Sequence, residues 1–151
     1  MKVNFKDSQG LRLVLAGLLV VAGLGAPALL NAADKNKSKV SEQMEVINDN
    51  YKTLRRAARG KELNEESVKL VEQMIAAAEK AKEMVPPMAE KKSGAEKDKF
   101  IADYKKEMDG MIATFKGLEA DLKAKKYDEA AKTIDKLNEI KKKGHDKFTE
   151  D

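Results

Sequence analysis

The stretch VSEQMEVINDNYKTLRRAA, residues 40–58, decides the fold class. Apolar side chains recur in it at alternating intervals of four and three residues, which is the spacing of one face of a helix packed in a bundle. The apolar positions are Val40, Met44, Ile47, Tyr51, Leu54 and Ala58. Ser38 or Ser41 can cap the start of this helix, and Gly60 can end it.

Three more helices with similar stripes are expected downstream. Asn64 can cap the second, which Pro86-Pro87 ends because proline excludes the helical conformation from the residue before it. Ser93-Gly94-Ala95-Glu96 matches a capping box for the third, and Tyr127-Asp128-Glu129 opens the fourth. The stripes are Leu70, Met74, Ala77, Ala81 and Met84; Ile101, Tyr104, Met108, Met111, Phe115, Leu118 and Leu122; and Ala130, Ile134 and Leu137. Short connections between four such helices predict an all-α fold, an antiparallel up-down-up-down four-helix bundle.

The composition agrees with this fold class and excludes several kinds of site. The chain has 151 residues, of which 37% are charged and 5% aromatic, a balance that favours helices. It contains no cysteine, so it can form no disulfide, no thiolate metal site and no thioether link to a cofactor.

The N-terminal residues have a different character from the rest. Lys2, Lys6 and Arg12 precede an apolar run from Leu13 to Leu30, and small residues follow at positions 31–33. This pattern is typical of a secretory signal peptide, residues 1–32, ahead of a bundle domain at residues 33–151. The run is also long enough to span a bilayer as an uncleaved anchor. Either reading places the bundle outside the cytoplasm, and we expect the periplasm.

The charge of the bundle domain speaks against nucleic acid as a partner. After the first 33 residues it holds 27 Lys and Arg against 25 Asp and Glu, a net charge of +2. That balance lacks the basic excess of nucleic-acid-binding proteins. The sequence also offers no paired catalytic carboxylates, nucleophile constellation or phosphate loop, so we expect no enzyme.

One end of the bundle is predicted to be thinly filled. Met44 near the start of the first helix and His145 near the end of the last should lie at one height, because the two helices run antiparallel. On the last helix Lys141 and Gly144 occupy stripe positions, which leaves a gap with a wet rim. A flat apolar ligand with charged edges, such as haem, would fit this gap. Alternatively, His145 is a solvated residue at a helix end, and Met44 fills the core.

At these residues the sequence resembles the cytochrome b562 family of soluble periplasmic haem proteins. The motif Met44-Glu45-x-x-Asn48-Asp49-Asn50-x-Lys52, the pair Pro86-Pro87 and the region around His145 carry the resemblance, over about residues 40–148. It implies one noncovalent haem b per chain with Met44 and His145 as its iron ligands. The pocket residues that it implies, besides these two, are Ile47, Pro87, Tyr104, Met108 and Lys141.

The sequence departs from the family pattern at several pocket positions. Family phenylalanines fall at Tyr104 and Met108, and Phe100 could serve instead if the third helix is shifted by a turn. Lys141 stands where members can carry arginine, and it cannot bind a carboxylate through two parallel hydrogen bonds.

We therefore expect a monomeric periplasmic electron carrier with redox partner proteins that the sequence does not identify. It should contact a membrane only if the N-terminal segment is uncleaved. The alternative is a haem-free bundle that binds proteins or Cu(I), because thioethers favour Cu(I) and two methionine pairs have helical spacing: Met84 with Met88, and Met108 with Met111.

Overall fold

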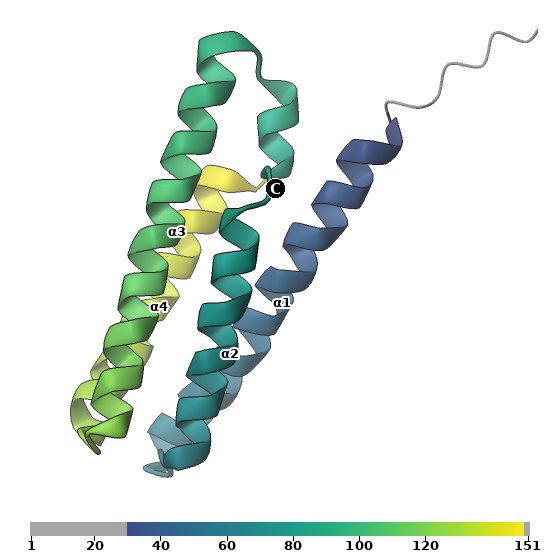
Figure 1. Ribbon diagram of the computed structural model, residues 1–151. Helices are drawn as coiled ribbons and strands as arrows, with labels where there is room; N and C mark the ends of the chain where they lie inside the picture. Colours follow the sequence, from purple (N-terminus) through teal and green to yellow (C-terminus); the bar gives the residue numbers. More distant parts are fainter. Residues whose placement is uncertain (1–29, 150–151) are drawn as a thin grey trace, which may run out of the picture.

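The computed structural model describes residues 30–149, which form a four-helix bundle with antiparallel neighbours (Figure 1). The helices are α1 (Leu30–Gly60), α2 (Glu65–Lys82), α3 (Gly94–Lys123) and α4 (Tyr127–Phe148), and a short 3-10 helix, η1 (Pro87–Lys91), lies between α2 and α3. Within the described residues there is no strand, so the predicted fold class is confirmed. The expected signal peptide or anchor falls mostly outside the described residues.

Most of the predicted stripe residues join one continuous core; Met44, Met84 and Ile101 are among those that do not. The largest fully buried side chains come from all four helices and from the α2–η1 connection: Phe115, Leu54, Met74, Leu118, Ile134, Val71 and Pro86. Three alanines on α2, Ala77, Ala78 and Ala81, are also buried and allow the neighbouring backbones to approach closely.

Local capping fixes the start of α2 but not that of α3. The Asn64 side chain accepts a hydrogen bond from the Glu66 N–H at 2.8 Å, and the Ser67 hydroxyl accepts one from the Asn64 N–H at 3.2 Å. This reciprocal pair satisfies two donors that the helix itself cannot. The capping box predicted at Ser93 is wrong, because the Ser93 side chain makes no capping hydrogen bond and Glu96 pairs with Lys92 at 2.6 Å.

Two helix boundaries differ from the prediction. α1 extends back to Leu30, the first described residue, so Ser38 and Ser41 lie within the helix and do not cap its start. α2 ends at Lys82, before Pro86, so Met84 lies outside the helix whose stripe it was expected to join. Pro86 has an extended backbone, with ψ at 141°, and Pro87 starts η1. This short helix was not predicted from the sequence.

The α1–α2 and α3–α4 turns lie together at one end of the bundle, and η1 lies toward the other (Figure 1). Each of these turns contains a lysine in the left-handed region: Lys61 has φ of 56° and Lys125 has φ of 58°. The expected stop, Gly60, is the last helical residue, and the left-handed position falls one residue later. We call the end that holds the α1–α2 and α3–α4 turns the turn end, and the opposite end, toward which η1 lies, the open end.

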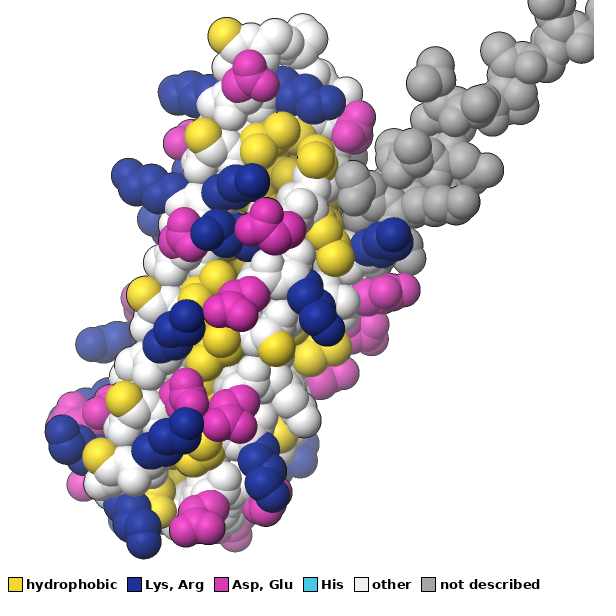
Figure 2. All heavy atoms as spheres, viewed as in Figure 1, with side chains coloured by type: hydrophobic (Ala, Val, Ile, Leu, Met, Phe, Trp, Pro, Cys, Tyr) yellow, Lys and Arg dark blue, Asp and Glu magenta, His cyan; other side chains and the backbone are white. Residues whose placement is uncertain are grey.

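The visible face of the bundle carries both signs of charge (Figure 2). On the face shown in Figure 2, Lys and Arg side chains alternate with Asp and Glu. α2 and α3 are joined by three ion pairs, Lys82 with Asp109, Lys116 with Glu79 and Lys123 with Glu72, at 2.7, 3.3 and 3.2 Å. Pairs as exposed as these each contribute about 0–1 kcal/mol. No helix in residues 30–149 has both the length and the apolar character needed to cross a membrane.

Candidate functional site

A cavity of about 790 Å³ opens at the open end of the bundle. Its walls come from α1, α3, α4, the α2–η1 connection and η1, with Met74 contributed by α2. All seven residues predicted for the site line this one cavity: Met44, Ile47, Pro87, Tyr104, Met108, Lys141 and His145. The volume falls within the range of small-molecule and cofactor pockets, roughly 300–1,000 Å³.

Met44 and His145 reach the cavity from opposite ends of the sequence. Met44 is on α1 and is 39% exposed, although the next apolar stripe residue, Ile47, is buried. His145 is on α4 and is exposed, and within residues 30–149 its imidazole has no hydrogen-bond or ion-pair partner. One thioether sulfur and one imidazole nitrogen therefore stand at the cavity with no competing interaction, which is the donor set of a haem iron with Met/His ligation.

The inner part of the cavity is apolar. Ile47, Tyr51, Met74, Phe115 and Leu137 line it and are all buried. On α4, Gly144 also lines it, and a β-carbon added there would meet no atom within 4 Å. The gap predicted around Gly144 is therefore present.

Of the two alternatives at the start of α3, Tyr104 lines the cavity and Phe100 does not. Tyr104 and Phe148 line it and pack edge to face with ring centroids 5.4 Å apart. Phe100 packs against the Phe148 ring at 5.3 Å and is not part of the lining. The Tyr104 hydroxyl donates to the Ala81 carbonyl at 2.9 Å, and burial raises the pKa of Tyr104 to about 12, so this hydroxyl stays protonated at neutral pH.

A second cavity tyrosine lacks such a partner. Tyr51 is 6% exposed, and its hydroxyl oxygen is buried with no hydrogen-bond partner, alone among the side chains of the described residues. Burying a hydroxyl without a partner costs about 1–3 kcal/mol. In the sequence Tyr51 is one member of an apolar stripe, and no motif indicates an unpaired hydroxyl.

The two tyrosines yield a paired prediction for the ligand-free protein. Tyr51→Phe should raise the free energy of unfolding by about 1 kcal/mol, because it removes an unsatisfied buried hydroxyl. Tyr104→Phe should lower it by about 1 kcal/mol, because it removes a made hydrogen bond. Urea unfolding followed by far-ultraviolet circular dichroism measures both. If Tyr51→Phe lost as much stability as Tyr104→Phe, the Tyr51 hydroxyl could not be unpaired in the folded protein.

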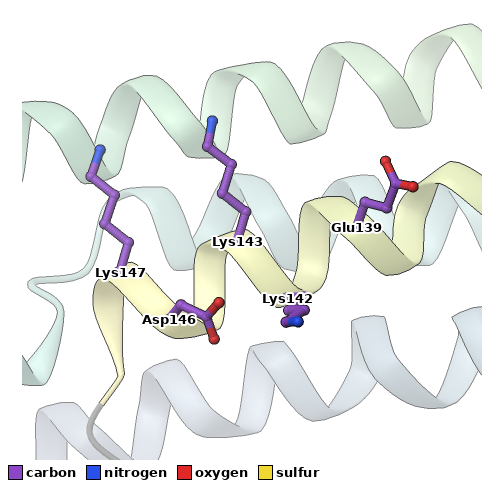
Figure 3. Close-up of a pocket in the computed structure, with 5 residues that line it drawn as sticks. All are labelled: Glu139, Lys142, Lys143, Asp146 and Lys147. Carbon is purple, nitrogen blue, oxygen red and sulfur yellow. The ribbon is translucent and has the colours of Figure 1, made fainter.

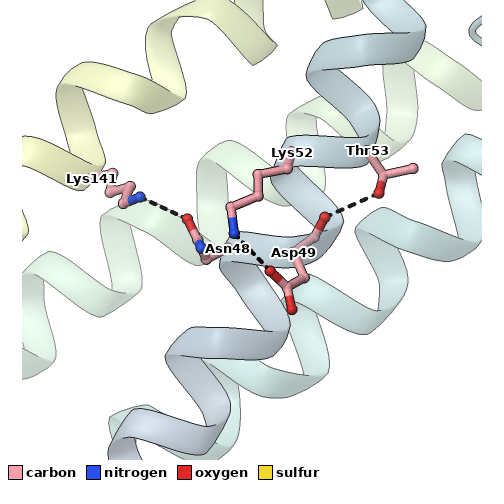
Figure 4. A network of polar contacts seen from close by, with 5 residues as sticks. All are labelled: Asn48, Asp49, Lys52, Thr53 and Lys141. Atoms are coloured by element: carbon pink, nitrogen blue, oxygen red, sulfur yellow. Dashed lines mark hydrogen bonds and ion pairs between the residues drawn. The ribbon is translucent and has the colours of Figure 1, made fainter.

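The rim of the cavity is polar. The Lys141 ammonium donates to the Asn48 side-chain oxygen at 2.7 Å across α4 and α1, and both residues line the cavity (Figure 4). On the α3 side, Glu107 lines the cavity and its carboxylate lies 3.3 Å from the Lys143 ammonium and 3.7 Å from that of Lys147.

A second depression, on the outer face of α4, differs in kind. It is lined by the charged residues Glu139, Lys142, Lys143, Asp146 and Lys147, and Lys143 and Lys147 extend from it toward α3 (Figure 3). It has no apolar lining side chain and no ligand donor other than exposed charges. In residues 30–149 no group of three or more His, Cys, Asp or Glu side chains could hold a metal ion.

A protein-family model described as Cytochrome b562 matches residues 39–149, which is most of the chain and includes α2, α3, α4 and the larger part of α1. The chain belongs to the cytochrome b562 family. Members of this family are haem-binding electron-transfer helical bundles, electron carriers rather than enzymes. A search of curated proteins found no match. The cavity fits the family's cofactor, because it joins an apolar interior to free imidazole and thioether donors and to a polar rim.

Several lining residues were not assigned to the site from the sequence. Tyr51, Met74, Phe115 and Leu137 were treated only as core, and Asn48 only as part of a motif. Asn48 follows Met44 by four residues, so its position on the same side of α1 could have been inferred. Its hydrogen bond to Lys141 could not, because that bond depends on the rotamers of both side chains and not on helix register alone.

Proposed function

We propose that this member of the cytochrome b562 family carries one noncovalent haem b, with Met44 and His145 as axial ligands, and serves as a one-electron carrier in the periplasm. The single observation that carries the proposal is the shared cavity of these two side chains. His145 supplies the imidazole of the cavity lining, Met44 is the most exposed of the methionines that line it, and neither side chain has a polar partner among residues 30–149.

In this proposal some residues bind the haem iron or a propionate, and others exclude water from the cavity. Haem bound there would supply a one-electron Fe(III)/Fe(II) couple. His145 provides a strong nitrogen donor from α4, and Met44 provides a thioether from α1, a pairing that raises the reduction potential. Both sit on regular helices, so their backbones are fixed in either oxidation state. Ile47, Tyr104 and Met108 exclude water from the interior, and Lys141 offers an ammonium to a propionate.

The proposed haem is held without a covalent bond, because the chain has no cysteine. We expect acid and organic solvent to extract all of the haem from the purified protein, and a denaturing gel to leave the polypeptide free of haem peroxidase activity. Electrospray mass spectrometry under denaturing conditions should give the polypeptide mass alone. A haem-sized mass increment that survives denaturation would contradict noncovalent binding.

The deciding experiment is one absorption spectrum of protein expressed with its N-terminal segment in place. The proposal expects a Soret band and the sharp visible bands of low-spin reduced haem, with a pyridine haemochrome of the b type. A colourless protein that stays colourless on titration with haemin would overturn it.

The compartment and the assembly state follow from the same proposal. Residues 1–32 would act as a secretory signal and leave residues 33–151 as a monomeric bundle that exchanges electrons with unidentified redox proteins. Cell fractionation and N-terminal sequencing of the recovered protein would separate this from an uncleaved anchor, which would keep the protein in the membrane fraction.

A Cu(I) site is the rival, and the cavity gives it one supporting observation. Four methionines, Met44, Met74, Met108 and Met111, line the cavity beside His145. Of the pairs singled out in the sequence, however, Met84 and Met88 are absent from the lining. The haem proposal accounts for the volume and the polar rim as well as the donors, so we prefer it.

A further inference from the structure

The contact between Lys141 and Asn48 occupies a particular place in the bundle. Lys141 precedes His145 by one helical turn on α4, and Asn48 follows Met44 by one turn on α1. The hydrogen bond between them, 2.7 Å long, therefore lies one turn inward from the two donor side chains, and both partners border the same cavity (Figure 4).

This contact is also the only polar side-chain link between α1 and α4 among the hydrogen bonds and ion pairs described for residues 30–149. The other polar side-chain links between helices in these residues join other pairs; we call the contact line between α1 and α4 the α1–α4 seam. α1 is tied to α2 by Asn50 and Gln73 at 3.0 Å, and α3 is tied to α4 by Lys143 and Lys147. The one polar link across the α1–α4 seam is thus placed beside the proposed ligands.

The chemistry of the pair leaves the ammonium available to an anion. A lysine ammonium has three N–H donors, and the Asn48 oxygen takes one of them. Asn48 carries no charge, so it orients the ammonium without neutralising it. The two carboxylates that line the cavity already have other partners: Glu107 pairs with Lys143 and Lys147, and Glu90 pairs with Lys97. Lys141 therefore keeps its positive charge and two donors at the rim.

We propose that Asn48 is a positioning residue that holds the Lys141 ammonium at the α1–α4 seam to receive a carboxylate, so that the site selects porphyrins with free propionates over esterified ones. This rests on the proposed haem function and adds a selectivity that the iron ligands do not provide. Neither His145 nor Met44 can distinguish a propionate from its methyl ester.

The test compares binding of haemin and haemin dimethyl ester, titrated by absorption into the wild type and three variants. In Lys141→Met the Kd for haemin should rise about tenfold, as expected for a lost hydrogen bond to a charged group. In Asn48→Ala it should rise by a smaller factor, about threefold. In both variants the Kd for the dimethyl ester should stay as in the wild type.

Asn48→Asp gives a readout that a purely structural role would not produce. The new carboxylate would neutralise the Lys141 ammonium and repel a propionate, so haemin affinity should fall about tenfold, whereas the α1–α4 link becomes an ion pair. The melting temperature of the haem-free variant should therefore not fall although binding weakens. Moderate salt should recover part of the loss for haemin and change nothing for the ester.

Two matched controls separate the effect from net charge and from loss of an asparagine. Lys142→Met removes the same charge from the neighbouring exposed residue outside the cavity, and Asn50→Ala removes an α1 asparagine that bonds to α2. Neither should change discrimination between haemin and its ester. Equal losses for both ligands in Lys141→Met and Asn48→Ala, or unchanged binding of both, would overturn the inference. Absence of haemin binding by the wild type would instead refute the proposed function.

Discussion

Met44→Ala should still bind haem, but with its iron turned largely high-spin. The variant keeps His145 as a strong nitrogen donor. The Met44 thioether that it lacks is a weak ligand, especially toward Fe(III). Met44 is 39% exposed, so water can enter the vacated position. The reduction potential should also fall, because the ligand that favours Fe(II) is gone. Absorption and EPR spectra in both oxidation states measure the change, and potentiometry measures the potential.

His145→Ala should lose far more affinity than Met44→Ala. It removes the stronger donor and leaves only a thioether, so we expect at least a hundredfold rise in Kd, roughly 3 kcal/mol or more. Met84→Leu is the control, because Met84 lies outside the cavity lining and its replacement should leave the spin state unchanged. An unchanged low-spin spectrum in Met44→Ala would remove Met44 from the site.

Haem should raise the melting temperature of the protein strongly. A ligand that binds only the folded state stabilises it by about 4 kcal/mol when its free concentration is a thousand times Kd. For a domain of this size, that corresponds to an increase on the order of 10–20 °C. The cavity of about 790 Å³ is bordered by core residues from several helices, so the site exists only in the folded bundle. Thermal unfolding with and without saturating haemin measures the shift.

The control for that prediction is the double variant Met44→Ala and His145→Ala. It keeps the cavity but offers the iron neither donor, so most of the increase in melting temperature should disappear. If the double variant gained as much stability from haemin as the wild type, the stabilisation would come from nonspecific association of the porphyrin with apolar surface. Equal melting temperatures with and without haemin in the wild type would contradict a specific pocket.

The fold could be predicted because it depends on periodicity. Val40, Ile47, Tyr51 and Leu54 are all buried as their spacing requires, and so are the stripe residues of α4 and those of α3 except Ile101 and Met111, which are half-buried. The ends of the helices were less predictable because capping depends on side-chain rotamers and on what competes for them. Glu96 had the right position for a capping box but is bonded to Lys92 instead.

The cavity lining was predictable only in part. In an antiparallel bundle the helical rise per residue is enough to place Met44 and His145 at the same height. Gly144 has no side chain at a stripe position, which indicated a gap in the core. The choice between Phe100 and Tyr104 needed the actual rotation of α3, which a period of 3.6 residues does not fix at a helix end. The unpaired hydroxyl of Tyr51 and the bond from Lys141 to Asn48 depend on packing across helices far apart in sequence.

The left-handed lysines at the turn end have a consequence for how this scaffold can be redesigned. A residue with a β-carbon in that conformation is strained by about 1–2 kcal/mol, and Lys61 and Lys125 both adopt it at the end opposite the cavity. Loop engineering there can therefore relieve strain without moving either donor side chain. A substitution in either turn can thus change the stability of the bundle at the end opposite the proposed haem ligands.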